Sequence, residues 1–521
     1  MKIHRNHYPS LVACFGSRRR RKESLIQSVS SGKFETPYVV SYGNELFLNS
    51  LLALSLIAGC AVGPNYKAPK ISVPPSFVNG TQTQYTPDQP VAAWWRGFDD
   101  AELNKLVEAA SASNLDLRIA TANLLQARAL RLGAKSDFFP VVTGEASYDN
   151  VKYSQAGLFG ATGVGRQEEL YTLGFDAAWE LDIFGRVRRS VQAATASVQA
   201  AQATRHDVLV SLTSEVARNY FELRGTQNEL AVLRRNADNE RETLKITQDR
   251  LDAGSGTDLD VARARAQLNI NLAAIPPAES AIAHAIHRLG VLTGRQPEAL
   301  TGELETPAPP PHLPEMVAIG NPEDLLRRRS DIRAAERNLA ASTAGIGVAT
   351  ADLFPRVTFI GDIGLQATSF VGLGGPASDT RSFGPAITWA ALDIGHVRSR
   401  IAAAGAGAAS GLAQYEKTVL TALEETENAL VDFGRIRARR DFLAESVKSS
   451  KAASDLAYAR YNDGAADFLT VLDAERVLLE AQDQLAQTET QTATALVAVY
   501  KALGGGWEQE VHPRQGSIAT H

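Results

Sequence analysis

Residue types that could perform catalysis are few and scattered along this 521-residue chain. His284 and His287 lie three positions apart in an Ala- and Ile-rich segment, a spacing that could offer two imidazoles to a metal ion. No carboxylate pattern accompanies them beyond Glu279, so we interpret the pair as incidental. No phosphate-binding loop motif occurs in the sequence. The sequence therefore predicts that the protein is not an enzyme and holds no metal or dissociable cofactor.

Acidic residues gather instead beside two glycine turns that are copies of each other. Arg250 to Gly254 and Arg460 to Gly464 match in length, and the two glycines lie 210 positions apart (464 − 254). Each glycine stands where one helical pattern ends and another is about to begin. The acidic side chains after the two turns are Asp258, Asp260, Asp467 and Asp473. Each can be explained as a helix N-cap or a first-turn residue favoured by the helix dipole, and for Asp258 and Asp467 we prefer that explanation.

Very long helices must hold these turns. No proline occurs from Gly185 until Pro276, and 186 to about 251 has the pattern of one helix about 100 Å long. Apolar residues recur along it every seven positions, as in a coiled-coil seam: Leu209, Val216, Leu223, Leu230, Ala237, Leu244 and Leu251. The second seam position is only partly apolar, with Leu212, Asn219, Thr226 and Leu233. We expect packing against neighbours of similar length and a returning helix from 258 to about 292.

Hairpins of alternating sequence precede both long helices, at 141–183 and 356–394, each with a Gly-rich loop. The clearest strand is 170–183. One face would carry Tyr171, Leu173, Phe175, Ala177, Trp179 and Leu181, and the other Thr172, Gly174, Asp176, Ala178, Glu180 and Asp182. Aromatics along one face of such a stretch fit a transmembrane strand of ~9–11 residues. A soluble hairpin with one wet face is the alternative that this segment leaves open.

The second half of the chain repeats the first, in the order helix, strand, loop, strand, long helix, glycine turn, helix. The steps Phe139-Pro140 and Phe354-Pro355 lie 215 positions apart (355 − 140). The repeat divides the chain into a leader with a signal at 1–59, an extended arm at 60–100, repeat one at 101–293, a Pro-rich linker at 294–321, repeat two at 322–504 and a tail at 505–521.

The arm is rich in Pro, Gln, Thr and Ser from Ala61 to about Val91, which predicts an extended rather than a packed segment. It ends at an aromatic cluster that we expect to anchor it in the core, formed by Trp94, Trp95 and Phe98. Helix-compatible sequence follows from about 101 to 135. Asp99 and Asp100 are the candidates for its N-cap.

Four strands per chain are too few to close a barrel, and lipid does not tolerate an open sheet edge. Membrane strands of this kind require an oligomer, and three copies would supply twelve. The predicted fold class is a mixed α/β membrane protein, in which a duplicated coiled-coil barrel of long helices continues a β-barrel closed as a trimer. Such a molecule is a conduit. The net charge of −5 gives no support to nucleic-acid binding.

Cys60 follows the apolar run Leu51 to Gly59, which is too short to span a bilayer and fits a signal peptide. The ending Leu-Ile-Ala-Gly-Cys resembles a bacterial lipoprotein signal, which implies diacylglycerol and palmitate on Cys60 and a tether to membrane lipid. A short buried helix with an incidental cysteine is the alternative. Because the basic run Arg18 to Lys22 lies unusually far upstream, 1–45 is either sequence before the true start or a leader without function.

From about Cys60 to Trp507 the chain resembles the outer-membrane factors of Gram-negative efflux systems, the TolC-like and OprM/NodT-like lipoproteins. The resemblance is carried by Gly63 to Pro69, Trp94 to Phe98, both Phe-Pro steps, Leu181 to Gly185 and Tyr461 to Ala474. It implies a homotrimer in the outer membrane, with a twelve-stranded barrel and a helical periplasmic tunnel closed at rest. It also implies two partners, a periplasmic adaptor (membrane fusion) protein and an inner-membrane RND-type pump that supplies the energy.

The same resemblance implies a periplasmic gate just after the turn glycines Gly254 and Gly464. The matching positions are Asp260, Leu469, Thr470 and Asp473, and Tyr461 could bond across the turn. Three copies would give rings of carboxylates, which bind cations, and a ring of leucines, which excludes water. The chain departs from some relatives at Ala466, where they have an arginine, and at Thr470, where they have an aspartate. For Asp473 we favour the gate role over a first-turn role.

The predicted function is a passive outer-membrane channel of a tripartite efflux pump that exports small molecules such as drugs and other toxic solutes. A TolC-like exit duct for type I protein secretion is the first alternative, although the lipoprotein signal and the Trp94-Trp95 arm resemble the multidrug branch more. The second alternative is a lipid-anchored structural coiled-coil protein without a pore. Alternating strands with Gly-rich loops argue against it.

Overall fold

The computed structural model describes residues 61–82, 84–89, 91–154 and 167–505, all of which belong to one compact unit, Gly59–His521. The leader expected at 1–59, Cys60, most of the first Gly-rich loop and most of the tail at 505–521 lie outside the described residues. In the described part of the chain, no helix combines the length and the apolar character needed to cross a bilayer.

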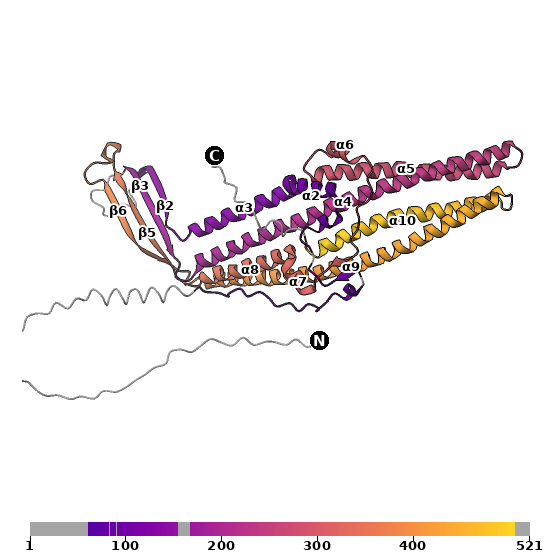
Figure 1. Ribbon diagram of the computed structural model, residues 1–521. Helices are drawn as coiled ribbons and strands as arrows, with labels where there is room; N and C mark the ends of the chain where they lie inside the picture. The colour runs from indigo at the N-terminus through magenta and orange to yellow at the C-terminus, as the bar shows by residue number, and fades with distance from the viewer. Residues whose placement is uncertain (1–60, 83, 90, 155–166, 506–521) are drawn as a thin grey trace, which may run out of the picture. The chain divides into compact units, whose positions relative to one another are not determined.

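Four long helices form two hairpins. The first consists of α4 (Arg186–Asp252) and α5 (Asp258–Leu292), and the second of α9 (Ile394–Asn462) and α10 (Phe468–Ala502). α4 contains 67 residues, so its length is about 100 Å at 1.5 Å per residue. The turns of both hairpins lie at the same end of the helices, far from the sheet (Figure 1). We call these two turns, with the first residues of α5 and α10, the tip.

The heptad seam of α4 is buried as its pattern predicts from Leu209 to Ala237. The polar Asn219 of the second seam is buried as well. Both seams are covered because α4 packs against α3, α5, α8 and α10 rather than against a single neighbour. The largest apolar cluster surrounds Tyr220 and Phe221 in the middle of α4 and includes side chains of α2, α5, α9 and α10.

The segment expected to be helical over 101 to 135 is helical except for a break at Asn114. α2 covers Ala101–Ser113 and α3 covers Leu115–Ser136. The Asn114 side chain accepts a hydrogen bond from the backbone N–H of Leu117 at 3.0 Å and donates one to the carbonyl of Leu292 at 3.0 Å. One side chain thus caps α3 and holds it to the end of α5, so the break is stabilised by a residue far away in the sequence.

The second repeat has the same break, at the position 215 residues later (329 − 114). α7 (Pro322–Arg328) and α8 (Ser330–Ala351) are separated by Arg329. Its buried guanidinium binds Asp331 and Glu425, each at 2.7 Å, and the carbonyl of Ala502 at 3.0 Å. The two breaks therefore occupy equivalent places but use unrelated side chains.

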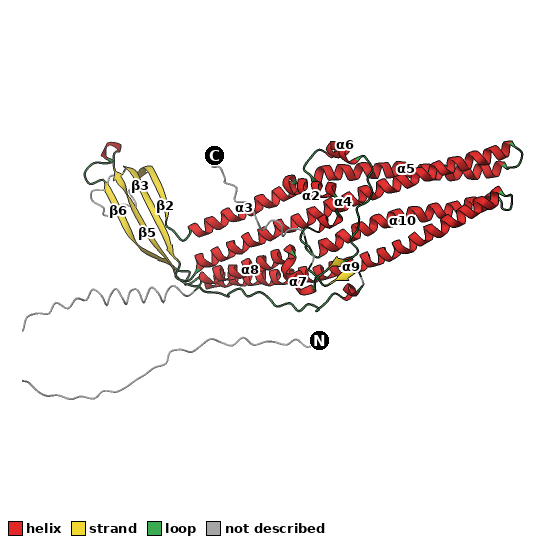
Figure 2. Cartoon of the chain, in the orientation of Figure 1, coloured by secondary structure: helices red, strands yellow, loops and turns green. Residues whose placement is uncertain are grey.

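Four antiparallel strands form the main sheet, in the order β2-β3-β5-β6 (Figure 2). Their bounds are Val141–Lys152 for β2, Gln167–Leu181 for β3, Arg356–Ala367 for β5 and Asp379–Thr388 for β6. β3 ends two residues earlier than the expected 183. Asp182 leaves the strand because its carboxylate accepts hydrogen bonds from the N–H groups of Val187 and Arg188, both at 2.9 Å, and so caps α4.

The arm and the linker are more tightly packed than their compositions predict, which corrects both expectations. β1 (Tyr85–Thr86) in the arm pairs in parallel with β4 (Val317–Ala318) in the linker. Phe77, Tyr85 and Val317 are buried. Short helical turns complete these two segments, namely η1 (Val78–Thr81) and η2 (Trp94–Phe98) in the arm, and η4 (Pro297–Leu300) and α6 (Thr301–Leu304) in the linker. One further turn, η5 (Phe370–Gly372), lies in the loop between β5 and β6.

The aromatic anchor of the arm is confirmed. Trp94, Trp95 and Phe98 are buried, and the Trp94 ring stacks on Tyr500 of α10 with centroids 5.0 Å apart. Asp100 is the N-cap of α2, since its side chain accepts a hydrogen bond from the N–H of Leu103.

Candidate functional site

The main sheet has one apolar and one polar face. Paired residues of neighbouring strands point to the same side, so the strand register assigns each residue to a face. The apolar face carries Val142, Ala146, Tyr148, Tyr171, Leu173, Phe175, Ala177, Trp179, Val357, Phe359, Ile363, Leu365, Phe383, Pro385 and Ile387. Two charged residues at the loop end of β6, Asp379 and Arg381, point to the same side. The polar face carries Thr143, Glu145, Ser147, Asp176, Glu180, Asp362 and Ser382. Phe175 is 61% exposed in the single chain, so the apolar face requires an apolar environment.

Aromatic rings mark both ends of this apolar face. At the helix end, the indole N–H of Trp179 donates to the carbonyl of Phe138 at 2.9 Å. At the loop end, the rings of Tyr148 and Tyr171 lie 4.8 Å apart. Trp179 and Tyr171 are eight residues apart on β3, which corresponds to about 26 Å at ~3.3 Å per residue. Outer-membrane barrels carry an apolar band about 25 Å high between two aromatic girdles, and at their strand tilt of ~35–45° this length along β3 would span about 20 Å of that height.

The sheet is open on both sides. Within the described residues β2 pairs only with β3, and β6 pairs only with β5. Each outer edge presents a row of backbone N–H and C=O groups. In a bilayer each unsatisfied group would cost several kcal/mol, so a further strand must cover both edges.

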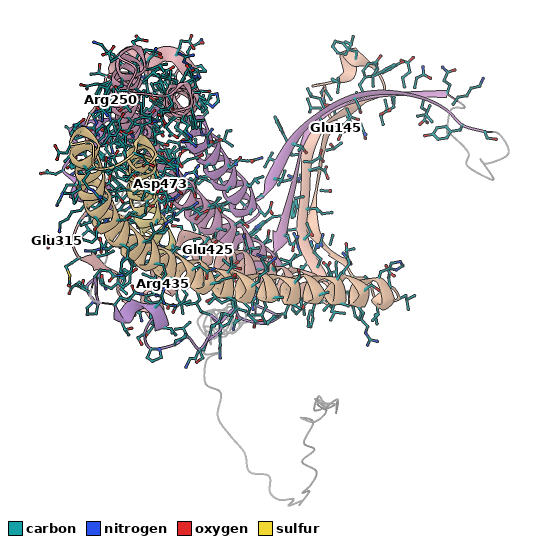
Figure 3. The ribbon with its side chains drawn as sticks, turned by 90° about the vertical axis from the view of Figure 1, so that its right-hand side faces the viewer. Glu145, Arg250, Glu315, Glu425, Arg435 and Asp473 are labelled. Carbon is teal, nitrogen blue, oxygen red and sulfur yellow. The ribbon has the colours of Figure 1, made fainter. Side chains whose placement is uncertain are left out.

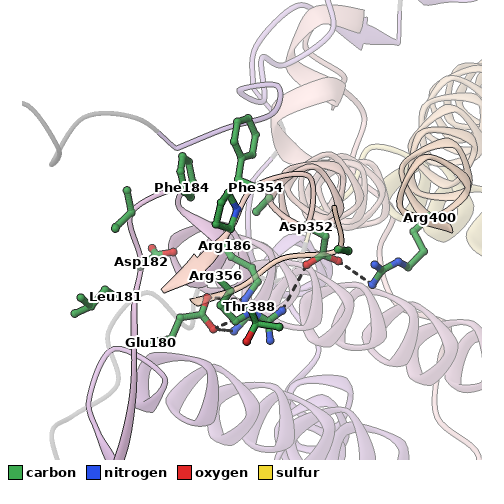
Figure 4. A pocket seen from close by; sticks show the side chains of 14 residues that line it. Glu180, Leu181, Asp182, Phe184, Arg186, Asp352, Phe354, Arg356, Thr388 and Arg400 are labelled. Carbon is green, nitrogen blue, oxygen red and sulfur yellow. Dashed lines mark hydrogen bonds and ion pairs between the residues drawn. The ribbon is translucent and has the colours of Figure 1, made fainter. Parts of the chain in front are cut away.

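Ion pairs join the sheet to the helices (Figure 4). Glu180 of β3 binds the Arg186 guanidinium of α4 at 2.5 and 2.8 Å and lies 3.7 Å from Arg356 of β5. Asp352, at the end of α8, lies 3.5 Å from Arg356 and 2.8 Å from Arg400 of α9. These alternating charges line a cavity of about 210 Å³ and fix the place where both repeats pass from helix to strand.

Each turn of the tip is closed by the hydrogen-bond pattern of a Schellman motif. In the first turn Gly254 N–H donates to the Leu251 carbonyl and Ser255 N–H to the Arg250 carbonyl, both at 2.9 Å. The second turn repeats the pattern with Gly464 and Ala465 as donors to the carbonyls of Tyr461 and Arg460. Gly254 and Gly464 have φ angles of 73° and 72°, the left-handed conformation that glycine adopts without strain.

Contacts between the first and second repeats hold the tip together. The guanidinium of Arg250 lies over the Tyr461 ring, and the Tyr461 ring lies 5.5 Å from that of Phe468. The bond that Tyr461 could make across its own turn is replaced by these ring contacts. Phe468 and Val471 are buried in a cluster with Ala264 of α5, so the two hairpins share one small core here.

The tip also contains the predicted gate residues, and they differ in their contacts. Asp260 accepts a hydrogen bond from the Thr257 hydroxyl at 2.6 Å, while Thr470 donates its hydroxyl to Asp467 at 2.6 Å. Asp467 is the N-cap of α10, as expected. Asp258 lies in the first turn of α5, where Thr257 is the N-cap.

The remaining two gate candidates are exposed in the single chain. Leu469 is 49% exposed, an unusual position for a leucine unless another surface covers it. Asp473 is paired with Arg476 of its own helix at 2.8 Å. Figure 3 looks along the helices and labels Asp473 and Arg250 in the two hairpins. In the described part of the chain, no group of three or more His, Cys, Asp or Glu side chains is placed to hold a metal ion.

Two tip residues were missed by the sequence reasoning. Leu259 is 56% exposed and corresponds to Leu469 at the 210-residue offset of the turns (469 − 259), so the repeat itself could have identified it. Arg250 was noted only as part of its turn. Its contact with Tyr461 joins the two repeats, and no spacing in the sequence signals it.

Comparison with known proteins decides the family. Residues 106–295 and 321–505 match the family described as outer membrane efflux protein. The chain belongs to the outer membrane efflux protein family. The two matched ranges correspond closely to the two repeats, and the gap between them corresponds to the linker.

Relatives of this efflux protein match along nearly their whole length. It is 32% identical over 469 residues to the solvent efflux pump outer membrane protein SrpC of Pseudomonas putida, covering 88% of this chain and 97% of the relative. It is 32% identical over 461 residues to nodulation protein T of Rhizobium leguminosarum bv. trifolii, covering 87% and 96%. Among solved structures, the outer-membrane channel OprN matches with a TM-score of 0.82 at 44% identity, covering 86% of this chain and all of OprN.

These findings confirm the fold class of the efflux protein, a duplicated set of long helices continuous with four strands per chain. They also confirm the resemblance to outer-membrane factors. The efflux protein is an outer-membrane channel component of an efflux pump, and its activity is transport rather than catalysis.

Proposed function

We propose that three copies of this efflux protein close a twelve-stranded barrel in the outer membrane. The observation that carries the proposal is the open four-stranded sheet, with free edges at β2 and β6 and an exposed apolar face. Pairing β6 of one copy with β2 of the next would satisfy every edge and turn the apolar face to lipid. The polar face, with Glu145, Asp176 and Asp362, would line the lumen.

The long helices continue this lumen through the periplasm. α4 and α9 start directly at the sheet and run about 100 Å to the tip, a distance that suits a tunnel between two membranes. The chain carries no phosphate-binding motif, so the energy comes from an inner-membrane pump, for which we propose the RND type. A periplasmic adaptor would join the pump to the tip.

The tip is the resting gate in this proposal. Three copies of Asp260 and Asp473 would form acidic rings, and three copies of Leu469 an apolar constriction. Exposure of Leu469 in the single chain supports a role in contacts between copies. Thr470 and Tyr461 would stabilise the turn of each copy, through Asp467 and Arg250 respectively.

Small molecules are the proposed cargo. Relatives are named for solvent, toluene and antibiotic efflux, and each is at least 30% identical to this chain over about nine-tenths of its length. Protein secretion remains the alternative within the same architecture. Co-expression with an RND-type pump and adaptor should lower the susceptibility of a channel-deficient host to toluene, whereas restored export of a polypeptide by an ABC exporter would favour the alternative.

Lipidation of Cys60 is part of the proposal, and the residues after it support an anchor at the membrane surface. The N–H of Val62 donates to the Phe184 carbonyl at 3.1 Å, between β3 and α4. Buried Arg189 donates to the carbonyls of Val62 and Gly63 at 3.0 and 3.1 Å. The start of the arm is therefore held where the sheet meets the helices, which is the height of the inner lipid surface in this arrangement.

Currents across planar bilayers test the proposal. Purified protein should produce discrete single-channel steps that are small at rest, because the tip is closed. Absence of current in every preparation would favour the lipid-anchored coiled-coil protein without a pore.

A further inference from the structure

Two buried carboxylates share a cavity between the two helical hairpins, behind the tip. Glu240 of α4 is 3% exposed, and Glu475 of α10 is 8% exposed. The cavity has a volume of about 440 Å³ and its walls come from α4, α9 and α10. Glu240 lies 14 residues before Gly254 (254 − 240), which places it about 21 Å from the turn. The two carboxylates belong to different repeats of the chain.

The two carboxylates differ in how many of their oxygen atoms have hydrogen-bond partners. The Oε1 atom of Glu475 accepts from the hydroxyl of Tyr458 and lies 3.4 Å from the hydroxyl of Thr243. Its Oε2 atom has no partner among the described residues, and the same is true of both carboxylate oxygens of Glu240. The amides of Asn271 and Gln267 on α5 are near Glu240, but neither is aligned for a hydrogen bond to it. A buried carboxylate that lacks aligned donors is disfavoured in its ionised form, so Glu240 is the group that should carry a proton.

The charged groups around the cavity do not neutralise the pair. They are Glu242 on α4, Lys451, Asp455 and Tyr458 on α9, and Glu475 on α10, while α5 contributes only the amides of Gln267 and Asn271. Lys451 is paired with Asp455 at 3.3 Å, and both side chains are about two-thirds exposed. Among the described residues, Lys451 is the one cation that lines the cavity, and it pairs with a different carboxylate at the surface.

The electrostatics agree with this geometry. Burial, with a smaller contribution from the Glu475 charge, raises the pKa of Glu240 to about 7, although the amides of Asn271 and Gln267 oppose the shift. Burial also raises the pKa of Glu475, against hydrogen bonds from Tyr458 and Thr243. Burial and the bond to Glu475 raise the pKa of Tyr458, so its hydroxyl remains a donor.

We propose that Glu240 and Glu475 form a proton-binding site that joins the two hairpins of one chain. With the proton bound, the pair carries at most one charge, and α4 and α10 pack closely. Without it, two like charges face one cavity, water enters and the hairpins separate. Proton loss would therefore loosen the tip. This consequence for conduction rests on the proposed function, whereas the proton site itself does not.

The difference between the pKa of Glu240 in the folded and in the unfolded protein gives the direction in which stability changes with pH. The folded protein holds the Glu240 proton up to about pH 7, whereas an unfolded glutamate releases it near pH ~4.3. The contribution of Glu240 to the stability of the folded protein is therefore fully present below about pH 4.3 and is lost as the pH rises from there to about 7. E240Q imitates the protonated side chain and should remove this part of the pH dependence. D238N changes an exposed carboxylate two residues before Glu240 that does not line the cavity, and it serves as the matched control.

Melting curves of the detergent-purified full chain test the site directly. Between pH 5.5 and 8.5 the Tm of the wild-type protein and of D238N should fall by about 2 °C more than the Tm of E240Q. Equal slopes for wild type and E240Q would overturn the proposal. In planar bilayers, wild-type conductance should rise over the same range while E240Q stays at its low-pH value.

The two measurements separate this inference from the proposed function. If E240Q conductance followed the wild type at every pH, the coupling to the tip would be wrong. If no preparation conducted, the channel assignment would fail, and the melting comparison alone would decide whether the proton site exists.

Discussion

The guanidinium carbon of Arg250 lies 3.8 Å from the centre of the Tyr461 ring. Arg250 lies in the last turn of α4 and Tyr461 in the last turn of α9, so this cation–π contact joins the tip ends of these two helices, which belong to different repeats. The Arg250 guanidinium makes a second contact with the end of α9, at 3.5 Å from the side-chain oxygen of Asn462. If the tip is the resting gate, this pair holds the two hairpins of each chain together in the closed state.

Arg250→Ala should loosen the tip and raise single-channel conductance. A cation–π contact of this kind contributes ~0.5–2 kcal/mol, so the closed state should lose roughly that amount of stability. A double-mutant cycle with Tyr461→Leu isolates the pair, and the two changes should be non-additive by a similar amount. Arg265→Ala, an exposed arginine two turns into α5, is the control and should leave conductance unchanged.

Asp473→Ala combined with Leu469→Ala should raise conductance further than either change alone. The first removes the proposed acidic ring and the second opens the proposed apolar constriction. Because Asp473 is exposed and paired only with Arg476 of its own helix within the described residues, the fold should tolerate both changes. Asp463→Ala, at the turn itself, is the matched acidic control. Unchanged conductance in the double variant would remove the gate assignment.

Phe175→Lys should block assembly in the outer membrane, whereas Asp176→Lys should be tolerated. The two residues are neighbours on β3, and they point to opposite faces of the sheet. Phe175 lies midway between Trp179 and Tyr171, where a lysine facing lipid costs ~2–4 kcal/mol. Quantities of folded protein in purified outer membranes measure both effects. Equal recovery of the two variants would contradict the assignment of the apolar face to lipid.

Cys60→Ser should abolish incorporation of labelled palmitate, because the serine hydroxyl cannot replace the thiol that carries the lipid. The protein should still reach the outer membrane, since its strands rather than its lipid hold it there. Arg189→Ala is a useful companion, as it releases the arm from α4 without touching Cys60. Labelled palmitate on Cys60→Ser would show that the anchor assignment is wrong.

The repeat and its long helices could be predicted because their signals are local and periodic. The heptad seam and the turn glycines predict where α4 ends, and the alternation in β3 predicts which side chains share a face. The repeat extends to contacts that the sequence does not state. Trp389 donates its indole N–H to the Leu353 carbonyl at 3.0 Å, as Trp179 does to Phe138 in the first repeat.

Features that depend on distant partners could not be predicted. The break at Asn114 needs the carbonyl of Leu292, and the break at Arg329 needs Glu425 and Ala502. A proline-rich linker gives no sign that Val317 will pair with the arm. For the same reason, the gate residues of the tip can be predicted only from the family resemblance. The contact of Arg250 with Tyr461 becomes visible only in the three-dimensional structure.

The number of chains in one assembled particle tests the central claim most directly. Native mass spectrometry of the lipid-modified protein, released from detergent, should give three times the mass of one processed chain. Because the free edges at β2 and β6 must be covered by other copies, no stable smaller species should insert into bilayers. A monodisperse single chain that remains folded and water-soluble without detergent would contradict the account.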